Sequence, residues 1–501
     1  ANVMGASAMS DVFLLANKIP NFLRRLFAEG AFAQAFVPVL SEYQLKDKDE
    51  AQLTGKLNQH EQTRLLLAQV SGTLGVIVTW VTLFGMLASP VVVMLFGFGW
   101  FIEWFNDAPG GERFDLAANL LKITFPYLWF ISFTALAGAV LNTMGKFAVS
   151  AFTPVLLNVG IILMAIYGSE YTQSPAHALA WGVFLGGLIQ FLFQLPFLYK
   201  AGMLVNPKWA WHSEGVIKVR KLIIPALFGV SVTQINLLLD TLIASFLVTG
   251  SISWLYYSNR LLEFPLGLFG IGIATVILPS LAKLHSSNNP KEFKATIDWG
   301  IRVICLFGWP ALAGLMILAQ PIIIVLFMRG QFNEHEVLQV SYALFAYLSG
   351  LLSFMFIKVL APGYYARQDT KTPVKIGIKA MVANMAFNLM LTPFFGYVGL
   401  AIATTLSATL NAFLLYQGLN RAGVYQLSSA TLFFIGKLIT AAGVMALVVY
   451  QLSFDFDVWV ALTLVERIQH LVVCIVAGGA SYFATIFILG IRLRDFKVKA
   501  V

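Results

Sequence analysis

The sequence predicts an all-α polytopic membrane protein, and three observations lead to that fold class. The chain has 501 residues, of which 58% are hydrophobic and only 11% are charged, whereas soluble domains carry about 25% charged residues. Apolar runs of about 20 residues, the length of a membrane-spanning helix, recur along most of the chain. None of these runs shows the alternation of polar and apolar residues that is typical of a transmembrane β-barrel.

Thirteen hydrophobic segments are predicted, and each is long enough to form a helix. In chain order they are 11–40, 65–90, 117–141, 151–168, 177–199, 222–246, 252–281, 302–327, 338–361, 374–393, 398–418, 429–451 and 467–490. The first and the seventh segments are the least purely apolar, because both carry charged residues inside the run.

Lysine and arginine are distributed unevenly between alternate connections. One set holds 24 of them, in 41–64, 142–150, 200–221, 282–302, 362–379, 419–437 and the C-terminal tail. The intervening connections hold three, which are Arg113, Arg329 and Arg467. Since basic connections stay on the cytoplasmic side, the first set and the C-terminus are predicted to be cytoplasmic. The net charge of +9 is thus explained by membrane topology, and no nucleic-acid partner is expected.

The start of the chain raises a question of topology. Thirteen segments with a cytoplasmic C-terminus would place the N-terminus outside, although ANVMGASAMSD is not a signal peptide. We therefore expect one further helix before residue 1. Fourteen helices would place both ends in the cytoplasm.

Two pairs of stretches resemble each other and indicate an internal repeat. LFAEGAFAQAFVPVLSEY (26–43) resembles GLFGIGIATVILPSLAKL (267–284), and TPVLLN (153–158) resembles TPVKIG (372–377). We expect two bundles of six helices, counting the preceding helix, followed by two further helices. The predicted domains are an N-terminal lobe at 1–199, an amphipathic interlobe linker at 200–221, a C-terminal lobe at 222–421, and two extra helices with a basic tail at 422–501.

The first segment contains KIPNFLRRLFAEGAF (18–32), in which four residues are charged. An arginine at the centre of a membrane helix costs about 2.5–3.5 kcal/mol by insertion scales. Arg25 and Glu29 are four residues apart and can pair on one helix face. Arg24 lies about 140° around the helix from Glu29, so it has no evident partner on its own helix. It either pairs with another helix or faces a polar cavity, where a guanidinium suits a phosphate or diphosphate.

The seventh segment, SWLYYSNRLLEFPLGLFG (253–270), repeats this theme. Arg260 and Glu263 are three residues apart and can pair. One arginine-bearing segment in each lobe predicts a cationic cavity that both lobes share, with Arg24 and Arg260 as the substrate-binding residues. Supporting roles in the cavity or its gate are assigned to Asp11, Lys18, Asn21, Arg25, Glu29, Ser253, Asn259 and Glu263.

A second group of polar residues lies inside apolar segments. It comprises Asp240, Asn384, Asn388 and Thr404. Oxygen ligands of this kind suit Na⁺ or a proton, and the alternative is a cluster of interhelical hydrogen bonds.

No catalytic constellation is found in the sequence. There is no nucleotide-binding loop, no set of histidines with metal-ligand spacing and no nucleophile elbow. Cys305 and Cys474 lie in apolar runs and are expected to be buried thiols. We therefore expect a transporter that is not an enzyme, has no cofactor, and draws on Na⁺, H⁺ or the membrane potential.

Three long stretches carry a resemblance to a known family. NKIPNFLRRLFAEGAFAQAFVPVLSEY, SISWLYYSNRLLEFPLGLFG and VLAPGYYARQDTKTPVKI resemble the MurJ (MviN) family of bacterial lipid II flippases, in the multidrug/oligosaccharidyl-lipid/polysaccharide exporter superfamily. The likeness runs from the first residues of the chain to its end. It implies fourteen helices, two six-helix lobes in a V-shaped arrangement, and two C-terminal helices that form a groove for a lipid tail.

The resemblance also implies functional residues. Arg24 matches the first arginine of the LRR motif, Glu29 the acid of AEG, Asp11 the acid before the first apolar run, and Arg260 the arginine of YYxxR. The family's first helix carries two further required arginines and would precede residue 1.

The implied substrate is lipid II, an undecaprenyl diphosphate that carries a disaccharide-pentapeptide. It would be moved from the cytoplasmic to the periplasmic leaflet by alternating access, for peptidoglycan synthesis. The expected setting is the bacterial inner membrane, where a monomer contacts membrane lipids and cell-wall synthesis enzymes. The competing hypotheses are a flippase for another polyprenyl-diphosphate glycan, a drug/cation antiporter of the same superfamily, and a scaffold that transports nothing.

Overall fold

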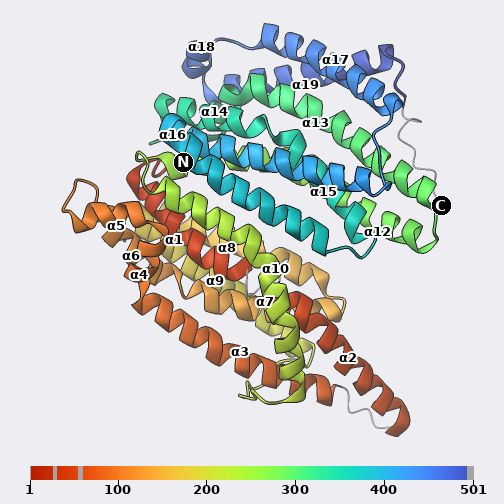
Figure 1. Cartoon of the computed structure of the whole chain (residues 1–501). Helices are drawn as coiled ribbons and strands as arrows, with labels where there is room; N and C mark the ends of the chain where they lie inside the picture. Colours follow the sequence, from red (N-terminus) through yellow and green to blue (C-terminus); the bar gives the residue numbers. More distant parts are fainter. Residues whose placement is uncertain (1, 26–30, 55–59, 493–501) are drawn as a thin grey trace. The chain divides into compact units, whose positions relative to one another are not determined.

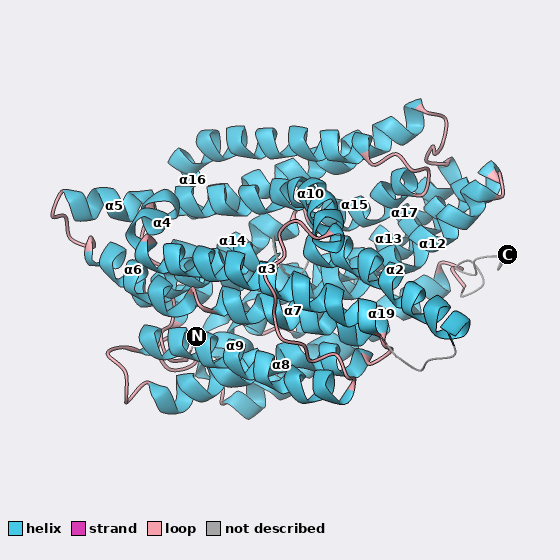
Figure 2. Cartoon of the chain, turned by 90° about the horizontal axis from the view of Figure 1, so that it is seen from below, coloured by secondary structure: helices cyan, strands magenta, loops and turns pink. Residues whose placement is uncertain are grey.

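The computed structural model describes residues 2–25, 31–54 and 60–492 (Figure 1). Every regular element in these residues is a helix (Figure 2), which confirms the all-α prediction. The chain divides into two compact units. We call Ser7–Thr249 the N-terminal unit, and Gly250–Val501 together with Ala1–Ala6 the C-terminal unit.

Many of the helices are long and apolar enough to cross a membrane. Among the described residues there are nine such helices, or ten if a pair bent by 40° counts as one span. Each predicted segment coincides with one or more helices, because runs of this length and apolarity satisfy their backbone hydrogen bonds within the helix. The total of fourteen helices stays a prediction.

The N-terminal unit is a bundle of helices, and its described part includes the π-helical turn η2. Its elements are α1 (Ala8–Arg24), α2 (Ala31–Thr54), α3 (Glu61–Leu87), α4 (Ser89–Phe96), α5 (Phe98–Phe105), α6 (Glu112–Thr124), α7 (Tyr127–Thr143), α8 (Phe147–Leu163), η2 (Met164–Gly168), α9 (Pro175–Lys200) and α10 (Glu214–Ala244). The short helices α4 and α5 were not among the predicted segments.

The core of this unit is formed by apolar side chains from α2, α3, α7, α9 and α10. Phe36, Leu40 and Val140 are fully buried in it. The Lys218 ammonium adds an ion pair to Glu42 of α2 at 2.8 Å. The compact units divide between residues 249 and 250, and α10 packs on α2 and α3 of the N-terminal unit. The predicted lobe and linker boundaries stay predictions.

The predicted linker region includes a connection without regular structure between α9 and α10. The amide of Lys208 donates to the carbonyl of Ala68 at 2.8 Å, and the amide of Ala210 donates to the Thr73 hydroxyl at 3.3 Å. A Cβ atom on Gly72 would lie 2.3 Å from the Lys208 backbone. The glycine therefore allows the connection to lie directly on α3.

The C-terminal unit contains the remaining helices. They are α11 (Ser251–Pro265), η3 (Leu266–Ile271), α12 (Gly272–Ser286), α13 (Pro290–Phe327), α14 (Glu334–Leu348), α15 (Leu351–Tyr365), α16 (Lys371–Arg421), α17 (Ser429–Leu452), α18 (Phe456–Ala461) and α19 (Leu464–Ile488). The pair α17 and α19 run alongside each other and pack against α13 (Figure 1).

Two breaks in this unit have local causes. The predicted segments 374–393 and 398–418 both lie in α16, and Gly396 separates them with φ 56° and ψ −135°, a conformation that glycine adopts at little cost. Between α11 and α12, the π-helix η3 follows Pro265. Proline has no amide hydrogen, and π-helical turns accommodate such interruptions within a helix.

The three arginines of the sparsely basic connections are held by neighbouring groups. Arg113 pairs with Glu103 at 2.5 Å and donates to the Thr249 hydroxyl. Arg329 donates to the carbonyl of Val325, and Arg467 donates to two carbonyls at the end of α18. Arg329 and Arg467 thereby stabilise the carboxyl ends of α13 and α18.

A polar network joins α13 to the start of α17. The Arg302 guanidinium pairs with Asp298 at 2.8 Å and also donates to the buried hydroxyl of Thr431. The Asp298 carboxylate accepts further bonds from Thr431 and from the Tyr425 hydroxyl. The network supplies a partner for both charges, which favours a fixed position of α17 on α13.

Replacing Asp298 by alanine is expected to destabilise the protein by about 3–5 kcal/mol, because Arg302 would lose its carboxylate partner in a largely buried position. Thermal unfolding in detergent measures the change. The double variant Asp298→Ala/Arg302→Met should recover part of the loss, and the exposed Glu334→Ala serves as a control. Unfolding of Asp298→Ala at the wild-type temperature would contradict this role of the network.

Candidate functional site

Arg24 is the last residue of α1, and its side chain is half-buried. Arg25 follows as the C-cap residue, and its side chain is exposed, while its amide donates to the carbonyls of Asn21 and Phe22. Glu29, the predicted partner of Arg25, lies outside the described residues. The two arginines thus differ in exposure, as their positions on the helix suggest.

Lys18 lies six residues before Arg24 on α1, and its side chain is half-buried. Its ammonium donates to the Thr241 hydroxyl of α10 at 2.6 Å. Asp240 lies within electrostatic range of the same ammonium. Helices α1 and α10 therefore bring Lys18 and Asp240, two ionisable residues of predicted membrane spans, near each other within the N-terminal unit. Sequence spacing could not show this, because the two residues are more than 200 positions apart.

Two other predicted polar residues, Asp11 and Asn21, also lie on α1. Asp11 is buried in the first turn, where the helix dipole favours a carboxylate. The Asn21 amide donates to the carbonyl of Asn17 at 2.8 Å. Both residues thus lie on the same helix as Lys18 and Arg24.

In the C-terminal unit, Arg260 projects from α11 and is about half-exposed. Its guanidinium pairs with Glu263 at 2.8 Å, as the spacing predicted, and lies 4.9 Å from the centre of the Tyr256 ring. The Asn259 amide donates to the other oxygen of the Glu263 carboxylate at 3.0 Å. The carboxylate and the ring orient the guanidinium while much of it stays accessible.

Ser253 is fully buried on the same helix. The neighbouring Ser258 donates to the carbonyl of Val340 at 2.8 Å, and Tyr257 packs between Phe327 and Phe332. These contacts fix the buried face of α11, so the face with Arg260 points away from the core of the unit.

The residues of the predicted cation site lie in both units. Asp240 belongs to the N-terminal unit, and the other three residues belong to α16. There the Asn388 amide donates to the Asn384 side-chain oxygen at 3.1 Å, and the Thr404 hydroxyl donates to the carbonyl of Leu400 at 2.9 Å. Asn384 and Asn388 are both buried.

Two features of these sites were missed in the sequence. Thr241 is the hydroxyl acceptor of Lys18, and its position next to Asp240 was the available signal. Asp298 and Arg302 lie in the predicted connection 282–302, but they are four residues apart, which is the spacing of an ion pair on a helix.

Comparisons with known proteins agree with this fold. A family model described as "Lipid II flippase MurJ" matches residues 1–469. A "Probable lipid II flippase MurJ" of Vibrio cholerae serotype O1 is 59% identical over 498 residues, which are 99% of this chain and 93% of that protein. The "Lipid II flippase MurJ" of Burkholderia cenocepacia is 39% identical and covers 100% of this chain and 94% of its own length.

Solved structures show the same similarity. "Lipid II flippase MurJ, inward closed conformation" has a TM-score of 0.79 and 25% identity, over 99% of this chain and 94% of that one. An inward-facing multidrug resistance transporter of the MATE family has a TM-score of 0.69 at 13% identity, over 84% of this chain and 92% of that one. The latter likeness concerns the fold alone.

The apolar helices of the described residues, nine or more of them long enough to cross a membrane, define a polytopic membrane protein. The chain belongs to the MurJ lipid II flippase family. The resemblance of its three motif stretches is thereby confirmed.

Lys18 and Asp240 are expected to be energetically coupled, because each neutralises the other in an apolar environment. Lys18→Met and Asp240→Asn should each lower the free energy of unfolding, and the double variant should be more stable than the sum of the two effects predicts, by about 0.5–3 kcal/mol. Unfolding of the purified variants in denaturant completes the double-mutant cycle. Strictly additive effects would show that the two charges do not interact.

Proposed function

We propose that this chain flips lipid II across the bacterial inner membrane by alternating access, so that peptidoglycan precursors reach the periplasmic leaflet. The observation that carries the proposal is membership of the MurJ family over nearly the whole chain, with relatives named as lipid II flippases at 59% and 39% identity. The membrane arginines fit such a substrate chemically. A diphosphate requires cations, and neither rival transport hypothesis is favoured by a comparison.

In this proposal, Arg24 and Arg260 bind the diphosphate of the headgroup. The guanidinium of Arg260 is accessible and is already oriented by Glu263 and Tyr256. Arginine binds phosphate oxygens through two parallel hydrogen bonds, which lysine cannot provide in the same geometry. Asp11, Lys18, Asn21, Arg25, Glu29, Ser253 and Asn259 support the cavity or its gate.

We assign the lipid tail to the pair α17 and α19. These helices expose large apolar side chains, including Phe433, Leu447, Phe483 and Phe487. An undecaprenyl chain needs a continuous apolar surface. Each methylene group that stays in contact with water loses the favourable free energy of transfer to an apolar environment.

The topology and setting belong to the same proposal. We infer that the C-terminus and the strongly basic connections are cytoplasmic, since 24 basic residues lie on that side and three on the other. We propose that the chain acts as a monomer, among membrane lipids and the enzymes of cell-wall synthesis, and that the predicted lobes alternate in access to the two leaflets.

The headgroup role of the arginines can be tested by complementation of a strain depleted of its own lipid II flippase. Arg24→Ala and Arg260→Ala should each fail to prevent lysis, because the diphosphate would lose a cation.

Arg24→Lys and Arg260→Lys test geometry against charge and should restore growth only in part. Arg64→Ala removes an exposed cation from a connection and should complement fully. Immunoblots establish that the variants reach the membrane. Full growth with both alanine variants would refute headgroup binding and would favour a scaffold role.

We further propose Asp240, in the N-terminal unit, as a ligand of a coupling Na⁺, with Asn384, Asn388 and Thr404 as the candidate ligands in the C-terminal unit. Their oxygens are the type that binds hard cations. The protein should then unfold at a higher temperature in sodium than in choline, and Asp240→Asn should remove the difference. Equal unfolding temperatures in both salts would leave H⁺ or the membrane potential as the coupling force.

A further inference from the structure

The connection between α9 and α10 (residues 201–213) is neither helix nor strand, yet it lies along α3, which is long and apolar enough to cross a membrane. The amide of Lys208 donates to the Ala68 carbonyl at 2.8 Å, and the amide of Ala210 donates to the Thr73 hydroxyl at 3.3 Å. Both acceptors lie inside the predicted segment 65–90. Thr73 is eight residues into that segment, or about 12 Å at 1.5 Å per residue. The connection therefore extends along α3 past the start of its apolar stretch.

The irregular backbone of the connection limits the environment in which it can lie. A helix bonds its own amides and carbonyls, whereas an irregular segment leaves such groups to water or to other parts of the protein. A Cβ atom on Gly72 would lie 2.3 Å from the Lys208 backbone, so the glycine allows two amides of the connection to reach α3. The other polar backbone groups need water or lipid headgroups. This requirement favours the membrane interface over the hydrocarbon core.

Two tryptophans of the connection form a stack that is partly exposed. The ring centres of Trp209 and Trp211 are 5.9 Å apart with an angle of 7° between the ring planes, and Trp209 is 56% exposed. Leu204 and Tyr199, next to them in the chain, are exposed as well, while Met203 is buried in the core of the unit. Tryptophan and tyrosine are enriched where a membrane meets water, because their rings are apolar and carry a polar atom.

The exposed apolar surface continues from the connection along α3. Val76 and Trp80 follow Gly72 at intervals of four residues, so they lie on the helix face that the connection touches. Both side chains are exposed. Lipid covers the exposed apolar side chains of a membrane span. Because the tryptophan stack adjoins this face of α3, the occupant that fits the stack is the lipid at the end of the span.

The side chains around the stack are mostly basic. Glu214 is the single acid of residues 199–224, and it pairs with Lys218 at 3.1 Å. The basic residues of this stretch are Lys200, Lys208, Lys218, Arg220 and Lys221. The Arg220 guanidinium lies 4.4 Å from the centre of the Trp211 ring, and among the described residues it forms no ion pair. The ring orients the guanidinium and leaves its N–H groups available to an anion.

We propose that the α9–α10 connection is an anchor at the membrane interface that prefers anionic phospholipids. Trp209 and Trp211 lie at the level of the headgroups, and Arg220 donates to the phosphate of an anionic lipid there. The leaflet is the one that the strongly basic connections face. The excess of basic residues gives the preference for anionic lipid. This inference does not rest on lipid II flipping, because none of its residues belongs to the proposed headgroup site.

The position of the connection can be tested with the full chain in nanodiscs. Asn206 is exposed, so Asn206→Cys can carry an NBD fluorophore in a chain whose own thiols are removed by Cys305→Ala/Cys474→Ala. Quenching by a nitroxide on the lipid headgroup is compared with quenching by a water-soluble nitroxide. We expect the lipid nitroxide to dominate at Asn206→Cys. The water-soluble nitroxide should dominate at Lys48→Cys, an exposed position in the polar end of α2.

The same label measures the preference for anionic lipid. Phosphatidylglycerol and phosphatidylcholine, each with a nitroxide on its acyl chain, are compared at equal content, and phosphatidylglycerol should be enriched at the label. Arg220→Gln should lower the enrichment about fivefold, which is the effect of one cation near a membrane surface. Lys291→Gln removes an exposed cation from the C-terminal unit and should leave the enrichment unchanged.

Two further variants test the aromatic part of the anchor. Trp209→Ser/Trp211→Ser should shift the quenching at position 206 from the lipid nitroxide toward the water-soluble one. Each variant is required to unfold at the wild-type temperature. If the double variant does not, Trp209→Ser alone should give a smaller shift in the same direction, because most of the Trp209 ring lies outside the packed core.

The results that would overturn the proposal are distinct. Dominant quenching by the water-soluble nitroxide in the wild type would show that the connection lies in water. Protection from both nitroxides would show that a protein surface covers it. Equal enrichment of the two lipids would exclude the role of Arg220. Transport enters none of these measurements, so a failure of the chain to flip lipid II in complementation would leave this inference unaffected.

Discussion

A charge in the core of a bilayer has no water to bind, so it must find its partner within the protein or in a ligand. Two charges within the predicted spans, Lys18 and Arg260, obey this constraint. Lys18 binds Thr241 in the electrostatic field of Asp240, and Arg260 is held by Glu263. The same requirement explains why the helices keep their backbone bonds internal and why their few interruptions fall at proline and glycine. Lys18 and Arg260 therefore mark a fixed contact and an accessible surface, respectively.

The ion pairs differ in what they leave accessible, and this difference separates structural from functional charges. Asp298 and Arg302 share their bonds with Thr431 and Tyr425, so the network is closed. Arg260 has a carboxylate on one side and an aromatic ring on another, yet about half of its side chain is exposed. The network of Asp298 and Arg302 holds two helices together. The guanidinium of Arg260 is partly accessible and can still donate hydrogen bonds to a phosphate.

Much of the fold was predictable from the sequence, because span length and apolarity are local properties. All thirteen segments coincide with helices, and the spacing of Arg260 and Glu263 was enough to predict their ion pair. The family was recognisable from three motif stretches. The short helices α4 and α5 were missed, since neither is long enough to give the signal of a span. The headgroup assignments to Arg24 and Arg260 stay proposals.

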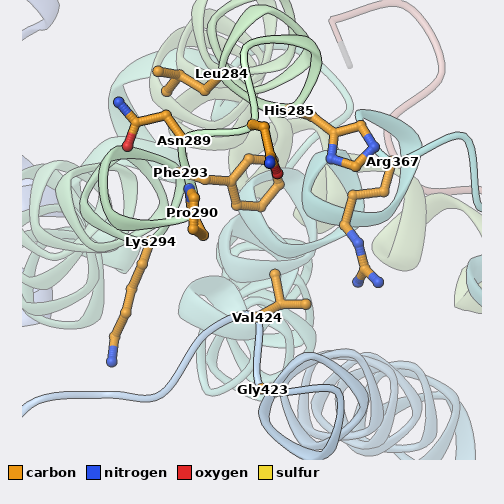
Figure 3. Close-up of a pocket in the computed structure, with 10 residues that line it drawn as sticks. Leu284, His285, Asn289, Pro290, Phe293, Lys294, Arg367, Gly423 and Val424 are labelled. Carbon is orange, nitrogen blue, oxygen red and sulfur yellow. The ribbon is translucent and has the colours of Figure 1, made fainter.

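Other features could not be predicted, because they depend on which helices meet. The contact of Lys18 with Thr241 joins residues at opposite ends of the N-terminal unit. The placement of α10 in that unit follows from its packing on α2 and α3, and from the ion pair of Lys218 with Glu42. A cavity lined by His285, Lys294, Arg367 and Val424 joins three connections (Figure 3), and no single stretch of sequence shows that these residues line one cavity.

The π-helix between α11 and α12 has a consequence for how the two halves of the chain correspond. A π-helical turn holds an additional residue compared with an α-helical turn, so everything after Ile271 is rotated by about 100° relative to an uninterrupted helix. A helical wheel drawn straight through this stretch would therefore assign the side chains of α12 to the wrong faces. An alignment of the repeats needs a one-residue gap at η3 wherever the other half lacks such a turn.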